Sequence, residues 1–217
     1  MGSLRMNEFY EQRKQMVAYQ LRARGIHDPG VLEAFEAIPR HLFVPEAALE
    51  WAYEDRPLLI GFDQTISQPY IVAYMVQALK LTGAERVLEV GTGSGYQAAI
   101  LSCLAREVHT IELIESLAER AARALSLVGV KNVFTHIGDG SQGWIESAPY
   151  DAIIVSAAAQ HVPQSLLNQL SDQGRMILPV RAGKHQYLEL WRRAGDSFSS
   201  ERLFPVAFVP LRGKEGI

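Results

Sequence analysis

The stretch Arg86-Val-Leu-Glu-Val-Gly-Thr-Gly-Ser-Gly95 decides the fold of this chain. The four positions that end in Glu89-Val90 are mostly apolar or β-branched and predict a buried strand. Three alternate glycines follow, and residues 96–104 then have the pattern of an amphipathic helix. Glycine has no Cβ, so Gly91, Gly93 and Gly95 let the backbone adopt positive φ and approach a ligand closely. The sequence therefore predicts a strand, a glycine loop and a helix whose first N–H groups are free to bind.

The spacing of the glycines indicates which ligand is meant. Dinucleotide-binding loops have the pattern G-x-G-x-x-G, and here Tyr96 stands where the third glycine would fall. The pattern is instead E-x-G-x-G-x-G, with Glu89 two residues before the first glycine. A carboxylate there repels a pyrophosphate and attracts a cation. The loop resembles that of Rossmann-like methyltransferases, whose ligand S-adenosyl-L-methionine carries a sulfonium and an ammonium; a purely structural turn is the alternative.

Composition and charge exclude several classes of protein. The 217 residues are 48% hydrophobic, which suits one compact unit with an appendage. The formal charge is −3 and basic residues never run beyond a pair, so no nucleic-acid partner is expected. The single cysteine, Cys103, is expected in the core; it excludes an internal disulfide and the usual zinc clusters, and no metal is predicted. No long apolar run or secretory signal is found. We expect a cytoplasmic monomer without a membrane partner.

Strands and helices alternate from Arg86 onward. Further strands are expected at 107–111, 133–137, 150–156 and 175–180, helices at 116–128 and 163–170, and an antiparallel strand pair at 187–193 and 202–209. This order predicts an α/β fold with a doubly wound, mostly parallel Rossmann-like methyltransferase sheet and an antiparallel C-terminal hairpin.

An N-terminal helical extension precedes the sheet. Helices are expected at 7–24, 31–38 and 70–81, and the proline-flanked segment 40–45 is expected to be extended. We divide the chain into residues 1–81, which hold this extension and the substrate and active-site loop, and residues 82–217, which form the S-adenosylmethionine-binding core.

Acids at the ends of two predicted strands are candidates for cofactor binding. Open parallel sheets bind ligands beyond the carboxyl ends of their strands. Glu112, at the end of the second strand, is therefore expected to bind the ribose hydroxyls, with a solvated acid as the alternative. Asp139 follows the third strand, where it is expected to accept the adenine amino group unless it is only a turn residue. The small residues 157–159 leave room for substrate, and Gln186 is expected to contact the ligand from above.

The chemistry is expected in the stretch Pro57 to Tyr70. It joins a short apolar run to a helix that begins near Pro69, with Ser67 or Gln68 as its expected cap, so polar side chains gather at the helix start. Ser67 lies directly before this helix, and its hydroxyl can face a ligand. The alternative role of Ser67 is that of a helix N-cap and nothing more.

Six segments together resemble one family, the protein-L-isoaspartate O-methyltransferases, over nearly the whole chain. They are Arg40-His-Leu-Phe-Val-Pro45, Ile60-Gly-Phe-Asp-Gln-Thr-Ile-Ser-Gln-Pro-Tyr70, Val87-Leu-Glu-Val-Gly-Thr-Gly-Ser-Gly-Tyr-Gln97, Gly138-Asp-Gly140, Ala148-Pro-Tyr-Asp-Ala-Ile153 with Ala157 to Ala159, and Phe208-Val-Pro-Leu211. The Thr-Ile-Ser-Gln-Pro segment is the specific part, because the glycine loop belongs to many methyltransferases.

The resemblance implies a role for each matched residue. Ser67 is implied as the catalytic residue. The residues implied to bind the cofactor are Thr65, Glu89, Gly91, Thr92, Gly93, Gly95, Glu112, Asp139, Gly140 and Gln186. Those implied to bind the substrate are Ile60, Gly61, Gln64, Ala157 and Ala158. Three positions depart from the family pattern: Asp63 replaces a usual glycine, Ser156 a common threonine, and Ala207 an arginine that often precedes the final Phe-Val-Pro-Leu.

The implied reaction is methyl esterification of the free α-carboxylate of L-isoaspartyl residues in damaged proteins and peptides, which starts their repair. A carboxylate with a pKa near ~4 is already ionised at neutral pH, so no strong base is needed. This agrees with a chain whose six histidines are scattered. Two alternatives share the cofactor loop: a small-molecule O-methyltransferase, which needs a base or metal not found here, and a non-catalytic S-adenosylmethionine-binding protein.

Overall fold

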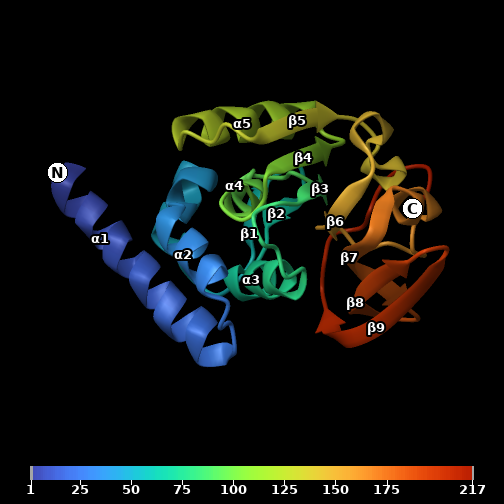
Figure 1. Ribbon diagram of the computed structural model, residues 1–217. Helices are drawn as coiled ribbons and strands as arrows, with labels where there is room; N and C mark the ends of the chain where they lie inside the picture. The colour runs from blue at the N-terminus through green and yellow to red at the C-terminus, as the bar shows by residue number, and fades with distance from the viewer. Residues whose placement is uncertain (1, 217) are drawn as a thin grey trace.

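The computed structural model describes residues 2–216, and the side chains of residues 7–216. The chain opens with helix α1 (Gly2–Gln15), which continues through a π-helical turn (Met16–Leu21) and a 3-10 turn (Arg22–Arg24). Helix α2 (Pro29–Ala37) follows and is capped by Asp28, whose side chain accepts a hydrogen bond from Val31 N at 3.1 Å. Figure 1 shows these helices on one side of the molecule, with the sheet beyond them.

A seven-stranded sheet forms the centre of the fold. Its strands are β3 (Arg86–Val90), β4 (Glu107–Glu112), β5 (Val133–Ile137), β6 (Tyr150–Val155), β7 (Leu170–Ala182), β8 (His185–Ala194) and β9 (Ser197–Val206). They lie in the order β5-β4-β3-β6-β7-β8-β9; the first five are parallel, and β8 and β9 are antiparallel additions at one edge. The chain order therefore reverses beside β3, which is where doubly wound sheets bind ligands. The predicted fold class is confirmed.

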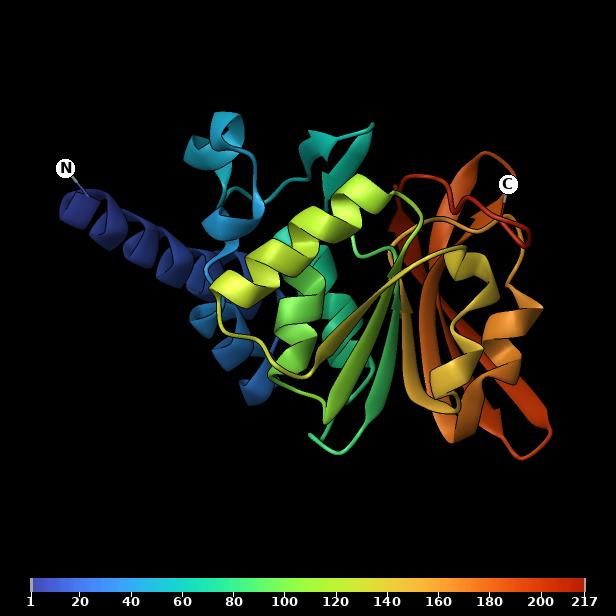
Figure 2. The same cartoon turned by 90° about the horizontal axis from the view of Figure 1, so that it is seen from above.

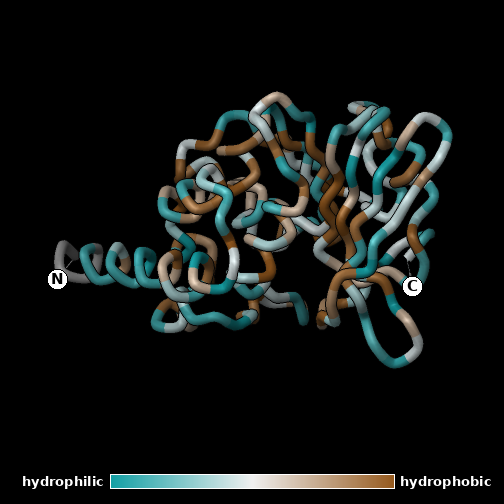
Figure 3. The backbone as a smooth tube through the Cα atoms, turned by 60° about the horizontal axis from the view of Figure 1, so that its bottom comes forward, coloured by the Kyte–Doolittle hydropathy of each residue, from teal (hydrophilic) through white to brown (hydrophobic). Residues whose placement is uncertain are grey.

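Helices cover both faces of this sheet because successive strand residues point to opposite sides. Val87 belongs to one hydrophobic cluster, shared with α2, α3 (Pro69–Ala78), α4 (Tyr96–Ser102) and α5 (Glu115–Leu127), whereas Leu88 belongs to a second cluster with α6 (Gln164–Asn168). Figure 3, in which the chain is coloured by residue hydropathy, shows hydrophobic residues concentrated in the central strands. Residues on both sides of the proposed boundary at 81 and 82 share the first cluster. That boundary stays a prediction.

A separate two-stranded hairpin, β1 (Leu58–Gly61) and β2 (Gln64–Ile66), carries the proposed active-site stretch. Figure 2 shows this hairpin beside the start of α5. Its turn residues Phe62 and Asp63 both have left-handed backbones, with φ of 55° and 56°. The hairpin leads directly into α3, with Pro69 in the first turn as predicted.

Three details differ from the sequence-based expectations, and a fourth chooses between two expected residues. The segment expected to be extended forms a 3-10 turn, Arg40–Phe43, in which Leu42 N donates to Pro39 O at 3.0 Å. Helix α4 is shorter than expected and buried from Tyr96 to Leu101, so it is not amphipathic. Cys103, at its end, is exposed rather than in the core. Of the two expected caps of α3, the N-cap residue is Gln68, without a side-chain capping bond, so Ser67 does not cap the helix.

Among the residues that the structure describes, no helix combines the length and the apolar character needed to cross a membrane.

Candidate active site

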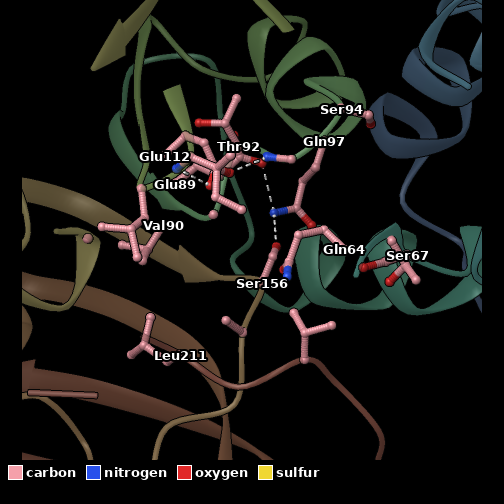
Figure 4. Close-up of a pocket in the computed structure, with 18 of the residues that line it drawn as sticks. Gln64, Ser67, Glu89, Val90, Thr92, Ser94, Gln97, Glu112, Ser156 and Leu211 are labelled. Carbon is pink, nitrogen blue, oxygen red and sulfur yellow. Dashed lines mark hydrogen bonds between the residues drawn. The ribbon is translucent and has the colours of Figure 1, made fainter. Parts of the chain in front are cut away.

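A cavity opens where β3, β4 and β6 end, between the β1–β2 hairpin and the segment that follows β9 (Figure 4). Its walls bring together most of the residues singled out in the sequence. Those that line it are Gln64, Thr65, Ser67, Glu89, Gly91, Thr92, Gly93, Glu112, Gly140 and Ala157. Segments far apart in the chain thus meet at the carboxyl edge of the sheet, as the topology requires.

The three glycines of the loop serve different purposes. All have positive φ: +91° at Gly91, +54° at Gly93 and +86° at Gly95. Gly91 and Gly93 line the cavity, whereas a Cβ at Gly95 would come within 3.1 Å of the Ala121 Cβ on α5. Gly95 is therefore needed for close packing of the loop against α5, and it does not line the cavity.

Glu112 braces the glycine loop from the next strand. One carboxylate oxygen accepts a hydrogen bond from Gly93 N at 2.8 Å, and the other accepts one from Ile114 N at 3.0 Å. A carboxylate oxygen has further acceptor capacity beyond one bond. Glu112 can therefore hold the loop and still accept hydroxyl donors from a ligand in the cavity.

Glu89 is a fully buried carboxyl at the end of the cavity. Its oxygens accept hydrogen bonds from Gln97 Nε2 at 3.0 Å and from Thr110 Oγ1 at 2.5 Å, and Thr110 lies 2.6 Å from the hydroxyl of Thr92. Burial raises the pKa of Glu89 to about 8 against these hydrogen bonds, which lower it. A positive group beside it favours the ionised form. The site therefore suits a cationic ligand better than a neutral one.

Gln97 links this acid to the opposite wall. Its Nε2 also donates to Ser156 Oγ at 2.8 Å, as the dashed lines in Figure 4 show. Gln97 was not among the residues predicted to form the site, because its only signal in the sequence is its place on the helix after the glycine loop. Ser156, one of the departures from the family pattern, thus joins β6 to the buried carboxyl of Glu89.

Three predicted site residues lie outside the cavity and support its walls. Burial acts to raise the pKa of Asp139, but hydrogen bonds from Lys214 N and Ser141 outweigh it and hold the pKa below its ordinary value. Gln186 exchanges two hydrogen bonds with the backbone of Phe208, at 3.1 and 2.7 Å. Ala158 N donates to Val209 O at 2.7 Å. Each therefore fixes the C-terminal segment that closes the cavity.

Ile60 and Gly61 also lie outside the walls of this cavity. Ile60 is buried, and its Cδ1 lies 3.5 Å from the position of a Cβ at Gly93. Gly61 has φ of +95° and is exposed at the end of β1. The hairpin therefore rests directly on the glycine loop through Ile60.

A second cavity adjoins the first on the side of the β9 segment. The two share four lining residues, namely Thr65, Ser67, Ser156 and Val209. The second cavity continues between the start of the hairpin at Pro57 and the segment 205–209. A group in one cavity and a group in the other can therefore meet beside Ser67.

The chemical character of the first cavity fits S-adenosyl-L-methionine. One part is apolar, lined by Val90, Ile111 and Leu211. A Cβ at Gly140 would lie 2.6 Å from Val90 Cγ1, so this wall approaches as closely as glycine allows. The carboxyl groups of Glu89 and Glu112 also line this cavity. The flat base of this cofactor suits the apolar wall, whereas its hydroxylated sugar and its cationic tail suit the two carboxyl groups.

Known proteins match the chain along nearly its whole length. Residues 11–216 match the family model described as protein-L-isoaspartate(D-aspartate) O-methyltransferase (PCMT). Protein-L-isoaspartate O-methyltransferase 1 of Rhodopseudomonas palustris (strain HaA2) is 52% identical over 210 residues, which cover 96% of this chain and 86% of the relative. The protein-L-isoaspartate O-methyltransferase of Dictyoglomus thermophilum is 49% identical over 207 residues, covering 95% and 94%.

Solved structures agree with the sequence relatives. A structure named protein-L-isoaspartate O-methyltransferase superposes with a TM-score of 0.87 at 30% identity, covering 94% of this chain and 67% of that one. A Plasmodium falciparum protein, described as a putative protein-L-isoaspartate O-methyltransferase in complex with S-adenosyl-L-homocysteine, gives 0.80 at 24% identity and supports the fold; the match covers 92% of this chain and 98% of that one.

The family resemblance found in the sequence is thus confirmed by relatives that share about half of their residues with this chain. The chain belongs to the protein-L-isoaspartate(D-aspartate) O-methyltransferase family.

Proposed function

We propose that the protein transfers a methyl group from S-adenosyl-L-methionine to the free α-carboxylate of L-isoaspartyl residues in damaged proteins and peptides, as the first step of their repair. The observation that carries this function is the junction of the two cavities beside Ser67. One cavity suits a cationic nucleoside, and the other lies between the hairpin region and the segment 205–209. The junction is where donor and acceptor would meet.

The cofactor would be held by the glycine loop, by Thr65 and Thr92, and by the acids Glu89 and Glu112. Bound S-adenosyl-L-methionine supplies an electrophilic methyl group on its sulfonium. Gly140 would let the base approach β3, while Asp139, Gly95 and Gln186 would act by supporting the walls. Fewer residues are therefore proposed to touch the cofactor than the sequence led us to expect.

The acceptor would enter through the second cavity. Gln64 and Ala157 line the first cavity. The backbones of Ile60 and Ala158 are held by hydrogen bonds with Arg120 and Val209, and Gly61 lies next to Ile60 at the end of β1. Ala207 lines the second cavity with a small side chain, so the arginine common in the family is not needed to shape this wall. Selection of isoaspartate over aspartate would depend on the extra backbone methylene fitting between hairpin and C-terminal segment.

Catalysis would rest on orientation and on exclusion of water. The acceptor carboxylate is ionised at neutral pH, with a pKa near ~4, so the site needs no general base. Neither cavity has a histidine among the described residues that line it. Aligning reactants in this way is worth up to roughly 7–11 kcal/mol in well-oriented systems.

Ser67 would orient the acceptor. Its carbonyl accepts a hydrogen bond from Arg40, and its hydroxyl has no hydrogen-bond partner among the described residues. Because Gln68 occupies the N-cap position, the hydroxyl is not used for capping. It is free to donate a hydrogen bond to a carboxylate in the junction.

The test is methyl transfer from labelled S-adenosyl-L-methionine to an isoaspartyl peptide, with Ser67→Ala as the variant and the exposed Ser126→Ala as its control. Loss of one hydrogen bond to a charged group costs about 1.5–3 kcal/mol, so kcat should fall about 10- to 150-fold in Ser67→Ala and stay unchanged in the control. An unchanged kcat in Ser67→Ala would remove the orienting role.

The same assay separates the alternatives. A non-catalytic binder would take up the cofactor in calorimetry and label no peptide, and a small-molecule O-methyltransferase would label hydroxyl acceptors instead. We also propose a cytoplasmic monomer that does not bind nucleic acid, supported by a formal charge of −3 and by a single cysteine, which needs no oxidising compartment. Sedimentation of the purified protein tests the monomer.

A further inference from the structure

Arg40 is a fully buried cation directly behind Ser67. Its side chain has no solvent exposure, although arginine is almost never fully buried unless it is paired. Nε donates to Ala52 O at 2.8 Å and Nη2 donates to Ser67 O at 2.9 Å. The guanidinium lies over the ring of Tyr96, with 5.0 Å to the ring centroid. The charge is thus held in one place by carbonyls and an aromatic face.

This cation has no carboxylate partner among the described residues. Asp55, whose charge acts on Arg40, forms its ion pair with Arg24 and accepts a hydrogen bond from Gln68 Nε2. Arg40 Nη1 is buried and has no hydrogen-bond partner in the described structure. Burial lowers the pKa of Arg40 to about 10, which still leaves it charged at neutral pH. Burying a charge without an opposite charge lowers the stability of the folded protein, which suggests that Arg40 has a function.

The place of Arg40 relative to the cavities indicates what this function is. Ser67, whose carbonyl it holds, lines both cavities at their junction, and Tyr96, whose ring it covers, lines the first cavity. A charge in a poorly hydrated interior acts more strongly and over a longer range than one in water. The field of Arg40 therefore reaches the junction through the residue that forms its wall.

We propose that Arg40 is a positioning residue that selects an ionised carboxylate as the acceptor: its guanidinium supplies the positive potential at the junction and fixes the Ser67 backbone there. The inference rests on the proposed function, because the acceptor carboxylate is the counter-ion that the buried guanidinium lacks. Arg40 does not itself touch the acceptor. The recognised chemistry is an anionic carboxylate, as opposed to a neutral amide of the same shape.

Two peptides that differ only in charge test this inference. One contains isoaspartate with a free α-carboxylate, and the other contains the α-carboxamide of the same residue. Their affinities are measured by calorimetry on protein saturated with S-adenosyl-L-homocysteine, so that no methyl transfer occurs. Wild-type protein should prefer the carboxylate by about tenfold or more. The preference should fall below about threefold in Arg40→Gln and Arg40→Met, and persist in Arg40→Lys.

Arg56→Gln is the matched control, since Arg56 adjoins Pro57 of the second cavity but is half exposed and pairs with Glu54. It should keep the wild-type preference. The ratio of the two affinities is the readout, because loss of a merely structural role of Arg40 would lower the affinity for both peptides by a similar factor. An unchanged ratio of the two affinities in Arg40→Gln would overturn the inference. So would a carboxylate preference that falls as much in Arg40→Lys as in Arg40→Gln. Binding of neither peptide by wild-type protein would instead contradict the proposed function.

A spectroscopic measurement covers the case in which the neutral variants do not fold. In wild-type protein with isotope-labelled arginine, the Arg40 Nε–H resonance, assigned by its absence in Arg40→Lys, should shift when the carboxylate peptide binds. The carboxamide peptide should shift it much less. Equal shifts from both peptides would overturn the inference without any neutral variant.

Discussion

Arg120 Nη1 donates a hydrogen bond to the carbonyl oxygen of Ile60 at 2.8 Å, which ties helix α5 to the β1–β2 hairpin. The same Ile60 rests on Gly93 of the glycine loop. The hairpin that carries Thr65 and leads to Ser67 is therefore held against the cofactor-binding core at two points. This contact explains how a two-stranded hairpin outside the main sheet keeps a defined position.

Replacing Arg120 by alanine should loosen the hairpin without unfolding the protein. A hydrogen bond from a charged donor contributes about 1.5 kcal/mol or more, so amide exchange in residues 58–66 should become about tenfold faster. KM for the isoaspartyl peptide should rise. Arg123→Ala is the control, since Arg123 lies one turn further along α5, is exposed and pairs only with Glu119 among the described residues. Equal exchange rates in the two variants would contradict the role of Arg120.

The departure at Asp63 has a conformational consequence. Phe62 and Asp63 both have φ near +55°, as in a type I′ turn, whose second position favours glycine. Aspartate tolerates this region better than alanine does. Asp63→Ala should therefore be less stable than Asp63→Gly by about 1 kcal/mol. Urea unfolding of both variants measures the difference, and an alanine variant as stable as the glycine variant would show that the turn is not strained.

Gly140 and Gly138 offer a paired test of the apolar wall that Val90 and Ile111 form. A Cβ at Gly140 would lie 2.6 Å from Val90 Cγ1, whereas one at Gly138 meets only Ile111 Cδ1 at an ordinary 3.5 Å. Gly140→Ala should lower stability by about 1–3 kcal/mol through overpacking. It should also weaken S-adenosyl-L-homocysteine binding. Calorimetry should find near wild-type affinity in Gly138→Ala; a similar loss in both variants would argue against the close wall at Gly140.

The buried carboxyl of Glu89 should make stability depend on pH. The folded protein keeps this proton up to about pH 8, whereas in the unfolded chain the carboxyl loses it near the ordinary value of 4.5. The folded state therefore binds more protons between these values, and the unfolding free energy should fall as pH rises through that window. One titrating group changes it by about 1.4 kcal/mol per pH unit.

Glu89→Gln removes this contribution and isolates it from other groups. The difference between wild-type and variant unfolding free energies, measured in urea from pH 5 to pH 9, should decline until about pH 8 and then level off. A difference that stays constant across this range would mean that Glu89 is ionised in the folded protein.

The sequence predicted those parts of the fold that depend on local patterns. The strand ending at Val90, its alternate glycines and the acid at the end of the next strand obey rules of spacing, and the parallel topology then brings their ends together. The role of Ser67 came from family resemblance and stays a prediction; the structure places Ser67 among the residues that line both cavities.

What the sequence did not predict depends on contacts between distant residues. Arg40 stands in a polar, proline-flanked segment, and only the tertiary structure buries it against Ala52 and Ser67. Gln186 was expected to face the ligand, but its partner is Phe208, 22 residues further along the chain. The role of Gln97 depends on its hydrogen bond to Ser156 at the end of β6, a residue far away in the sequence, so the helix pattern alone could not predict it.

The most direct test of the account compares two peptides of identical sequence, one with L-isoaspartate and one with L-aspartate at a single position. Both are incubated with the purified protein and labelled S-adenosyl-L-methionine, and base-labile methyl ester is counted. We expect one ester per isoaspartyl peptide and background labelling of the aspartyl peptide. Equal labelling of the two, or none of either by protein that binds the cofactor, would contradict it.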